Sequence, residues 1–151
     1  MTAGPDHEQI AGLLHTSGIA RGISPDALTV LSTKGISHDH WRIDETGLVL
    51  RIPRMNQWGL DPEAALTYQQ TAFHRSHQSG HTPRCLETLS PSIALPRGAL
   101  IVEEVLGRAP TLPDDLAAIA DALAALHAMP LPDEETLTPL QVHRNPVSST
   151  L

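Results

Sequence analysis

The residues between positions 34 and 63 could together recognise an anion. A glycine-bearing turn at 34–38 precedes two strand-like segments, and the second of these carries one cation, Arg51, inside an apolar run. An acid, Glu63, opens the helical pattern that follows Asp61-Pro62. Burying a guanidinium without an anion is costly, and guanidinium pairs well with carboxylate and phosphate groups. The pattern predicts Glu63 as the internal partner of Arg51 and a phosphate group as its external partner.

Turn signals and hydrophobic spacing predict the elements that must position these residues. Glu45-Thr46-Gly47 reads as a turn between two strands, and Pro62 fits the first turn of a helix. Asp6 and Gln9 form a capping pattern for an early helix. Strands are expected at 28–33, 41–44, 48–52, 84–89 and 98–105, and helices at 6–17, 62–78 and 113–129. The fold class is therefore α+β.

Composition narrows the possible classes of protein. The chain of 151 residues suggests one domain, and its core must be aliphatic because hydrophobic residues are 40% and aromatic residues 3%. A net charge of -7 argues against nucleic-acid binding. The single cysteine, Cys85, gives no internal disulfide, and no secretory signal or membrane span is seen. A cytoplasmic protein without a membrane partner is the expectation.

The ordered motifs resemble the amino-terminal lobe of a protein-kinase-like enzyme, and most closely the aminoglycoside phosphotransferase and choline kinase-like family. The resemblance spans about residues 28–130. It lies in these motifs: Gly35-Ile36-Ser37, Leu50-Arg51-Ile52-Pro53, Glu63, Thr82-Pro83-Arg84, the apolar strand and exit at 100–108, and Leu123-Ala124-Ala125-Leu126-His127.

The resemblance implies a five-stranded antiparallel sheet with a helix packed on it, then a hinge and one further helix. The segments would be an N-terminal helical segment at 1–27, a nucleotide-binding lobe at 28–106, a hinge exit and helix at 107–130, and a linker or disordered tail at 131–151. ATP would be the cofactor, with Mg²⁺ in a complete enzyme, and a small-molecule hydroxyl the acceptor. The implied nucleotide contacts are Lys34, Gly35, Ser37, His38, Arg51, Glu63, Glu103, Glu104 and Val105.

One departure from the family pattern limits the expected activity. The family's catalytic loop, which resembles His-Gly-Asp-x-x-x-x-Asn, and its later metal-binding Asp have no counterpart after His127. No catalytic residue is therefore assigned, and this chain is expected to be inactive by itself. The alternative is a non-catalytic lobe that binds a protein partner, or a second copy of itself, through the face that a second lobe would cover.

The nine histidines raise a metal-binding alternative. His74, His77 and His81 follow helical spacing closely enough to share a face. A zinc site needs three or four converging ligands, whereas Gly80 is expected to end the helix and no cysteine or carboxylate completes the set. A solvated helix face is the favoured interpretation, and no metal site is assigned.

Overall fold

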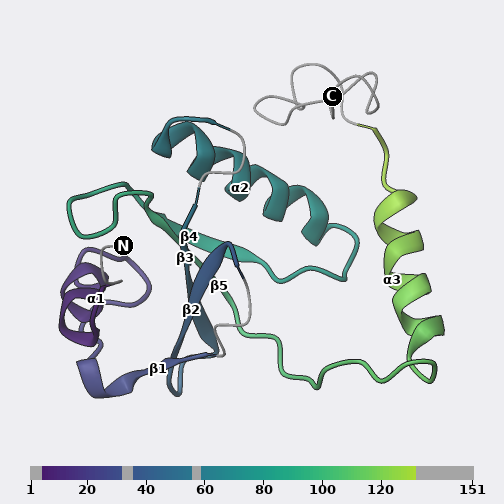
Figure 1. Ribbon diagram of the computed structural model, residues 1–151, viewed down its shortest axis with the longest axis horizontal. Helices are drawn as coiled ribbons and strands as arrows, with labels where there is room; N and C mark the ends of the chain where they lie inside the picture. Colours follow the sequence, from purple (N-terminus) through teal and green to yellow (C-terminus); the bar gives the residue numbers. More distant parts are fainter. Residues whose placement is uncertain (1–4, 32–35, 56–58, 132–151) are drawn as a thin grey trace.

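Five antiparallel strands form one sheet in the order β1-β2-β3-β5-β4 (Figure 1). The computed structural model describes residues 5–31, 36–55 and 59–131. The elements are α1 (His7–Leu14), the 3₁₀ helix η1 (Pro25–Ala27), β1 (Leu28–Val30), β2 (His38–Ile43), β3 (Leu48–Pro53), α2 (Pro62–His77), β4 (Cys85–Leu89), β5 (Ala99–Glu103) and α3 (Leu116–His127). The α+β class, the five-stranded antiparallel sheet, the helix packed on it and the further helix are confirmed.

The tight turn after β2 sets the register of the central hairpin. Glu45 and Gly47 have φ values of 62° and 68°, the left-handed conformation that such a turn requires. Ile43 pairs with Leu48 as a result, and further along the same ladder His40 lies opposite Arg51. On its other side β3 pairs with β5, so that Arg51 also lies opposite Leu100.

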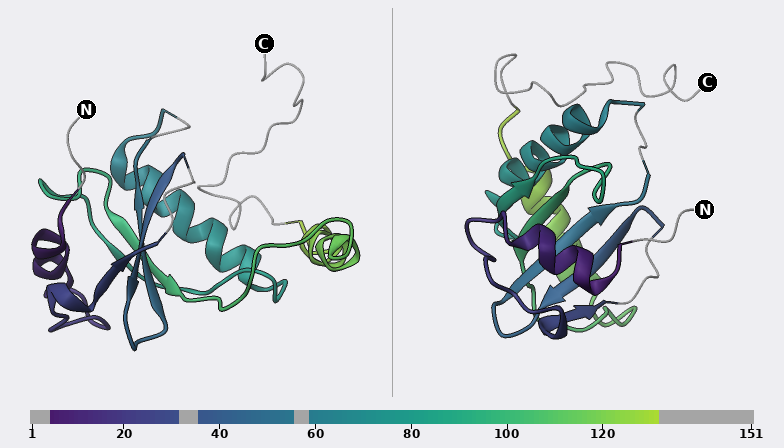
Figure 2. Two further views of the ribbon diagram at one scale, coloured as in Figure 1. Left: turned by 60° about the horizontal axis from the view of Figure 1, so that its bottom comes forward. Right: turned by 90° about the vertical axis from the view of Figure 1, so that its left-hand side faces the viewer.

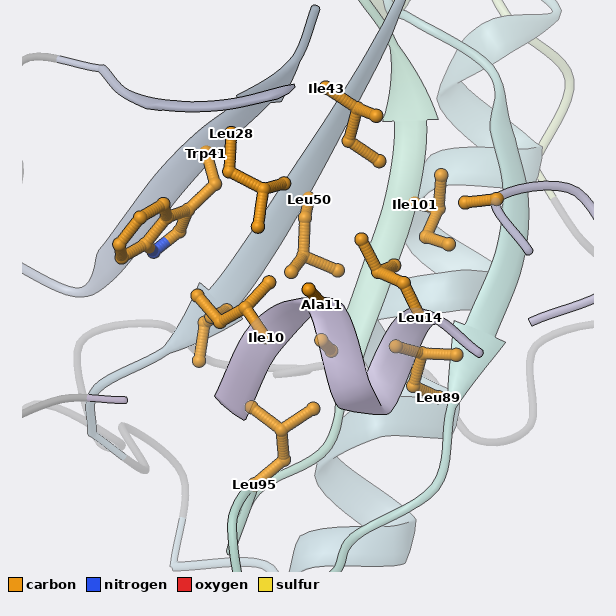
Figure 3. Close-up of a cluster of buried hydrophobic side chains, with 13 residues drawn as sticks. Ile10, Ala11, Leu14, Leu28, Trp41, Ile43, Leu50, Leu89, Leu95 and Ile101 are labelled. Carbon is orange, nitrogen blue, oxygen red and sulfur yellow. The ribbon is translucent and has the colours of Figure 1, made fainter. Parts of the chain in front are cut away.

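The two faces of the sheet bury separate aliphatic clusters under different helices. On one face α1 packs Ile10 and Leu14 against side chains from all five strands (Figure 3). On the other face α2 packs Leu66 against Val49, Leu100 and neighbouring residues of β4 and β5. The helices therefore cover opposite faces, as both views of Figure 2 indicate. Alternation along each strand decides which side chains meet which helix.

The first helix starts as predicted but ends earlier. Asp6 accepts a hydrogen bond from the Gln9 backbone, and the Gln9 side chain accepts one from the Asp6 backbone, which completes the capping box. The helix ends at Leu14 rather than near residue 17. Residues 17–19 instead bind Glu87, a carboxylate about seventy residues away in the sequence that no local pattern could indicate.

The last helix, α3, stands apart from the sheet (Figure 1). It contains no buried residue, and Leu116 and Leu123 on its apolar face are 57% and 50% exposed. The rest of the described chain therefore covers this face only in part. No described helix is long and apolar enough to cross a membrane. The tail expected at 131–151 lies, apart from Leu131, outside the described residues.

Candidate functional site

Arg51 is the centre of the candidate site, because it places a cation on the face of the sheet that α2 covers. Its side chain is half-buried between β2 and α2. Its Nη1 lies 3.2 Å from Nε2 of His40, and its Nη2 lies 3.1 Å from Nδ1 of His38. The guanidinium carbon lies 5.6 Å from the centroid of the Phe73 ring, within the range of a cation–π contact.

The predicted ion pair between Arg51 and Glu63 is wrong. Among the described residues, no carboxylate lies within ion-pair distance of Arg51. Glu63 is exposed in the first turn of α2, whereas Arg51 lies against Phe73, ten residues further along. At 1.5 Å per residue those two helix positions are about 15 Å apart. The number of residues between β3 and the start of α2 does not determine which turn of α2 packs against Arg51.

Within the described part of the chain, Arg51 therefore has no counter-charge and one unsatisfied donor. Its Nε is buried and has no hydrogen-bond partner among the described residues. Burial lowers the pKa of Arg51, although guanidinium remains charged at any physiological pH. A buried donor that lacks an acceptor is destabilising. An anionic group that reached this guanidinium would supply the missing charge and acceptors.

His38 links Arg51 to α2. Its Nε2 lies 2.9 Å from Oε1 of Gln69, while its Nδ1 faces Arg51. Its pKa is lowered chiefly by burial and also by the charge of Arg51, while the hydrogen bond to Oε1 of Gln69 opposes this shift. Burial, followed by the charge of Arg51, also lowers the pKa of His40. Both rings are thus biased toward the neutral form.

Ser37, which leads into β2, lies at the same end of the sheet as Arg51. The Ser37 carbonyl accepts a hydrogen bond of 2.8 Å from the Arg54 backbone, which closes the hairpin beyond the pairing of His38 with Pro53. The Arg54 side chain pairs with Asp39. The other two candidate residues of the turn, Lys34 and Gly35, lie outside the described residues.

The candidate adenine segment lies at the other end of β3. Glu103, at the end of β5, pairs with Leu48, and its side chain binds the Arg84 backbone and guanidinium. The backbone N–H of Glu104 donates to Gly47. Val105 follows the end of the strand and is 71% exposed, with no backbone hydrogen bond from its N–H to any described residue. A free N–H at this position could donate to a planar base.

The two ends of the candidate site lie at different levels along β3. Leu48 pairs with Glu103 across the sheet and lies three residues before Arg51 on β3. At a rise of 3.3–3.4 Å per residue, this separation is about 10 Å. The structure therefore brings His38 and Arg51 together, leaves residues 103–105 about three residues away along β3, and places Glu63 apart from both.

Two of the three histidines considered for metal binding, His74 and His77, make backbone contacts instead. The ring of His74 lies 3.3 Å from the Cys85 carbonyl, and Nδ1 of His77 lies 2.8 Å from the Thr82 carbonyl. Both contacts tie the end of α2 to the start of β4. Within the described ranges, no three His, Cys, Asp or Glu side chains are grouped to hold a metal ion.

Sequence reasoning missed three residues that surround Arg51, namely His40, Gln69 and Phe73. The signal for His40 was available: a turn at 45–47 pairs positions 43 and 48, and counting back along the antiparallel ladder places His40 opposite Arg51. Gln69 and Phe73 depend on the rotation and position of α2 against the sheet. No local spacing specifies that packing.

Comparison with known proteins gives no further identification: no family model, curated protein or solved structure matches this chain significantly.

Proposed function

We propose that this chain contains the nucleotide-binding lobe of an ATP-dependent phosphotransferase of the aminoglycoside phosphotransferase-like class, which acts on a small-molecule hydroxyl. The observation that carries the proposal is the half-buried Arg51 guanidinium, which no described carboxylate pairs with and whose Nε has no described acceptor. Phosphate is the anion that suits such a planar cation.

The arrangement of the sheet supports the same proposal. The strands β1 and β2 pair antiparallel, and a strand cation follows on β3. The helix α2 lies between β3 and β4 in the sequence, and β5 leads out to an exposed segment. This order agrees with the resemblance to the kinase-like lobe. Arg51 would then contact the phosphates, and the backbone at 103–105 would hold the adenine about 10 Å away along β3.

The chemistry of this lobe is electrostatic. ATP supplies the phosphoryl group, and phosphoryl transfer depends mostly on positioning and on charge stabilisation. Arg51 contributes a fixed positive charge, held by its neighbours before a ligand arrives. By the resemblance, the acceptor-orienting loop and the magnesium ligands belong to a part of the enzyme that has no counterpart in this sequence. The chain alone should therefore catalyse no phosphoryl transfer.

Nuclear magnetic resonance can locate the binding site. Adding ATP to ¹⁵N-labelled protein should shift the Nε–H signal of Arg51 and the backbone amide of Val105 together. The Glu63 amide, in the first turn of α2, is the internal control and should move less. Shifts scattered over the surface, or no shifts at millimolar ATP, would contradict the proposal.

One observation favours a second candidate function, a non-catalytic lobe that binds protein. The apolar face of α3 is exposed, and so are Val105 and Leu106, at 71% and 85%. Exposed apolar surface of this kind is typical of interaction sites. Sedimentation over a range of concentrations tests self-association through this face. A compact monomer at every concentration would count against assembly.

A further inference from the structure

The hydrogen bonds around Arg51 fix the protonation state of two histidines. A guanidinium has only donors, so the imidazole nitrogen that faces it must be unprotonated. His38 therefore accepts at Nδ1 and carries its proton on Nε2, where it donates to Oε1 of Gln69. His40 accepts at Nε2 and carries its proton on Nδ1. Both rings are neutral acceptors in this arrangement.

We propose that His38 and His40 are positioning residues that hold Arg51 only while both rings are neutral, and that an anion bound at Arg51 is accompanied by proton uptake on these rings. The proposal rests on the proposed function in taking phosphate as the anion. It adds a regulation of that site, namely that its affinity for phosphate groups increases as the pH falls.

Protonation of His38 or His40 would replace an attractive hydrogen bond to Arg51 with repulsion between two cations. Protonating either ring removes the acceptor that faces Arg51 and places a second cation within hydrogen-bond distance of the first. Without an anion, the protonated cluster is destabilised. With an anion at Arg51, each added proton strengthens the attraction. Binding and protonation are therefore linked, and each must favour the other to the same extent.

The other charged groups near Arg51, His38 and His40 do not remove this link between protonation and anion binding. On β2, Asp39 raises the pKa of both histidines, by less than burial and the charge of Arg51 lower it. Asp39 is paired with Arg54, whose own smaller effect lowers the pKa of His40. On the other elements that pack against the cluster, α2 presents Gln69 and Phe73, which do not titrate, and β5 presents Leu100.

The first test needs no ligand. ¹⁵N chemical shifts of the imidazole nitrogens should report the Nε2–H tautomer for His38 and the Nδ1–H tautomer for His40. The substitution Arg51→Met removes the positive charge and should raise the pKa of both His38 and His40. The opposite tautomers, or no change of either pKa in Arg51→Met, would overturn the positioning role.

The second test uses sulfate, which keeps its double negative charge between about pH 5 and pH 8, the range in which histidine titrates. The logarithm of its association constant should rise as the pH falls, by up to about one unit per pH unit for each proton taken up. In the double variant His38→Gln, His40→Gln the amide oxygens can still accept from Arg51 but cannot titrate. Whatever its strength, sulfate binding to this variant should show no pH dependence.

A matched control separates this effect from a general change in charge. His15 is exposed and follows the end of α1, so His15→Gln should keep the slope of the wild-type protein. Sulfate and ATP binding with no pH slope would overturn the proton linkage but leave the proposed function standing. No binding of either at any pH, with both tautomers as described, would overturn the proposed function and the linkage with it.

Discussion

The guanidinium of Arg51 lies over the ring of Phe73, the only phenylalanine in the chain, 5.6 Å from the ring centroid. This contact and the imidazoles of His38 and His40 hold the guanidinium, whereas the sequence predicted that a carboxylate would hold it. Among the described residues, the positive charge of Arg51 is therefore not neutralised by a carboxylate.

The contact between Arg51 and Phe73 should appear as a coupling free energy. Partly buried cation–π pairs contribute about 0.5–2 kcal/mol. We expect a double-mutant cycle of Arg51→Met and Phe73→Leu, measured by urea unfolding, to give a coupling of about 1 kcal/mol. Strictly additive effects would mean that the ring does not stabilise the guanidinium.

Glu63, in contrast to Phe73, should show no coupling free energy with Arg51. It is exposed and its position on α2 is about 15 Å from the turn that faces Arg51. Residues this far apart usually show additive effects on stability, within about 0.5 kcal/mol. The cycle of Glu63→Gln and Arg51→Met should therefore be additive. A coupling well above that limit would restore the ion pair that the structure lacks.

Gly98 should be the least replaceable glycine near the sheet. Its φ is +66°, and a Cβ there would lie 2.5 Å from the Leu89 carbonyl oxygen and 2.9 Å from a Leu66 methyl group. Gly98→Ala should reduce the free energy of unfolding by a few kcal/mol, through backbone strain and steric overlap.

Gly12 supplies the matched control for that substitution. It lies exposed inside α1, and a Cβ there would meet nothing within 4 Å. Gly12→Ala should increase stability by about 0.5–1 kcal/mol, because alanine favours the helix. Thermal unfolding of both variants decides the point. Equal effects would contradict the close approach of β4 and β5 around Gly98.

Glu87 should make the protein sensitive to acid. Burial acts to raise its pKa, but hydrogen bonds from Ser17 and from the backbone of Gly18 and Ile19 outweigh burial, so the pKa is lowered overall. A carboxylate with a lowered folded-state pKa stabilises the protein above its unfolded-state pKa of about 4.3, and this contribution is lost as the pH falls through the folded-state value.

The variant Glu87→Gln isolates this contribution. It should be less stable than the wild-type protein at neutral pH, and the difference should shrink at a pH well below about 4. Chemical unfolding across that range measures both. A difference that stays constant with pH would show that the charge of Glu87 does not matter. Glu8→Gln, at an exposed position in the first turn of α1, serves as the control.

Local sequence patterns predicted the elements better than their contacts. The capping residues of α1, the place of Pro62 in the first turn of α2 and the turn at 45–47 are confirmed, because each depends on neighbours within a few residues. The need of Arg51 for partners followed from burying a charge. The identity of those partners did not follow, because it depends on which turn of α2 lies on β3, and long-range packing decides that. Glu87 likewise binds a loop that is distant in sequence.

The proposed phosphate site is tested most directly by isothermal titration calorimetry with ATP and with adenosine. The comparison uses the wild-type protein, Arg51→Met, which keeps an apolar side chain beside Phe73, and Arg21→Met, which removes an exposed arginine before β1. The account predicts that Arg51→Met weakens ATP binding at least about tenfold, the equivalent of about 1.4 kcal/mol, and leaves adenosine binding unchanged. Arg21→Met should bind both ligands like the wild-type protein. An equal loss for ATP and adenosine in Arg51→Met, or no loss for either, would contradict the assignment of Arg51 to phosphate.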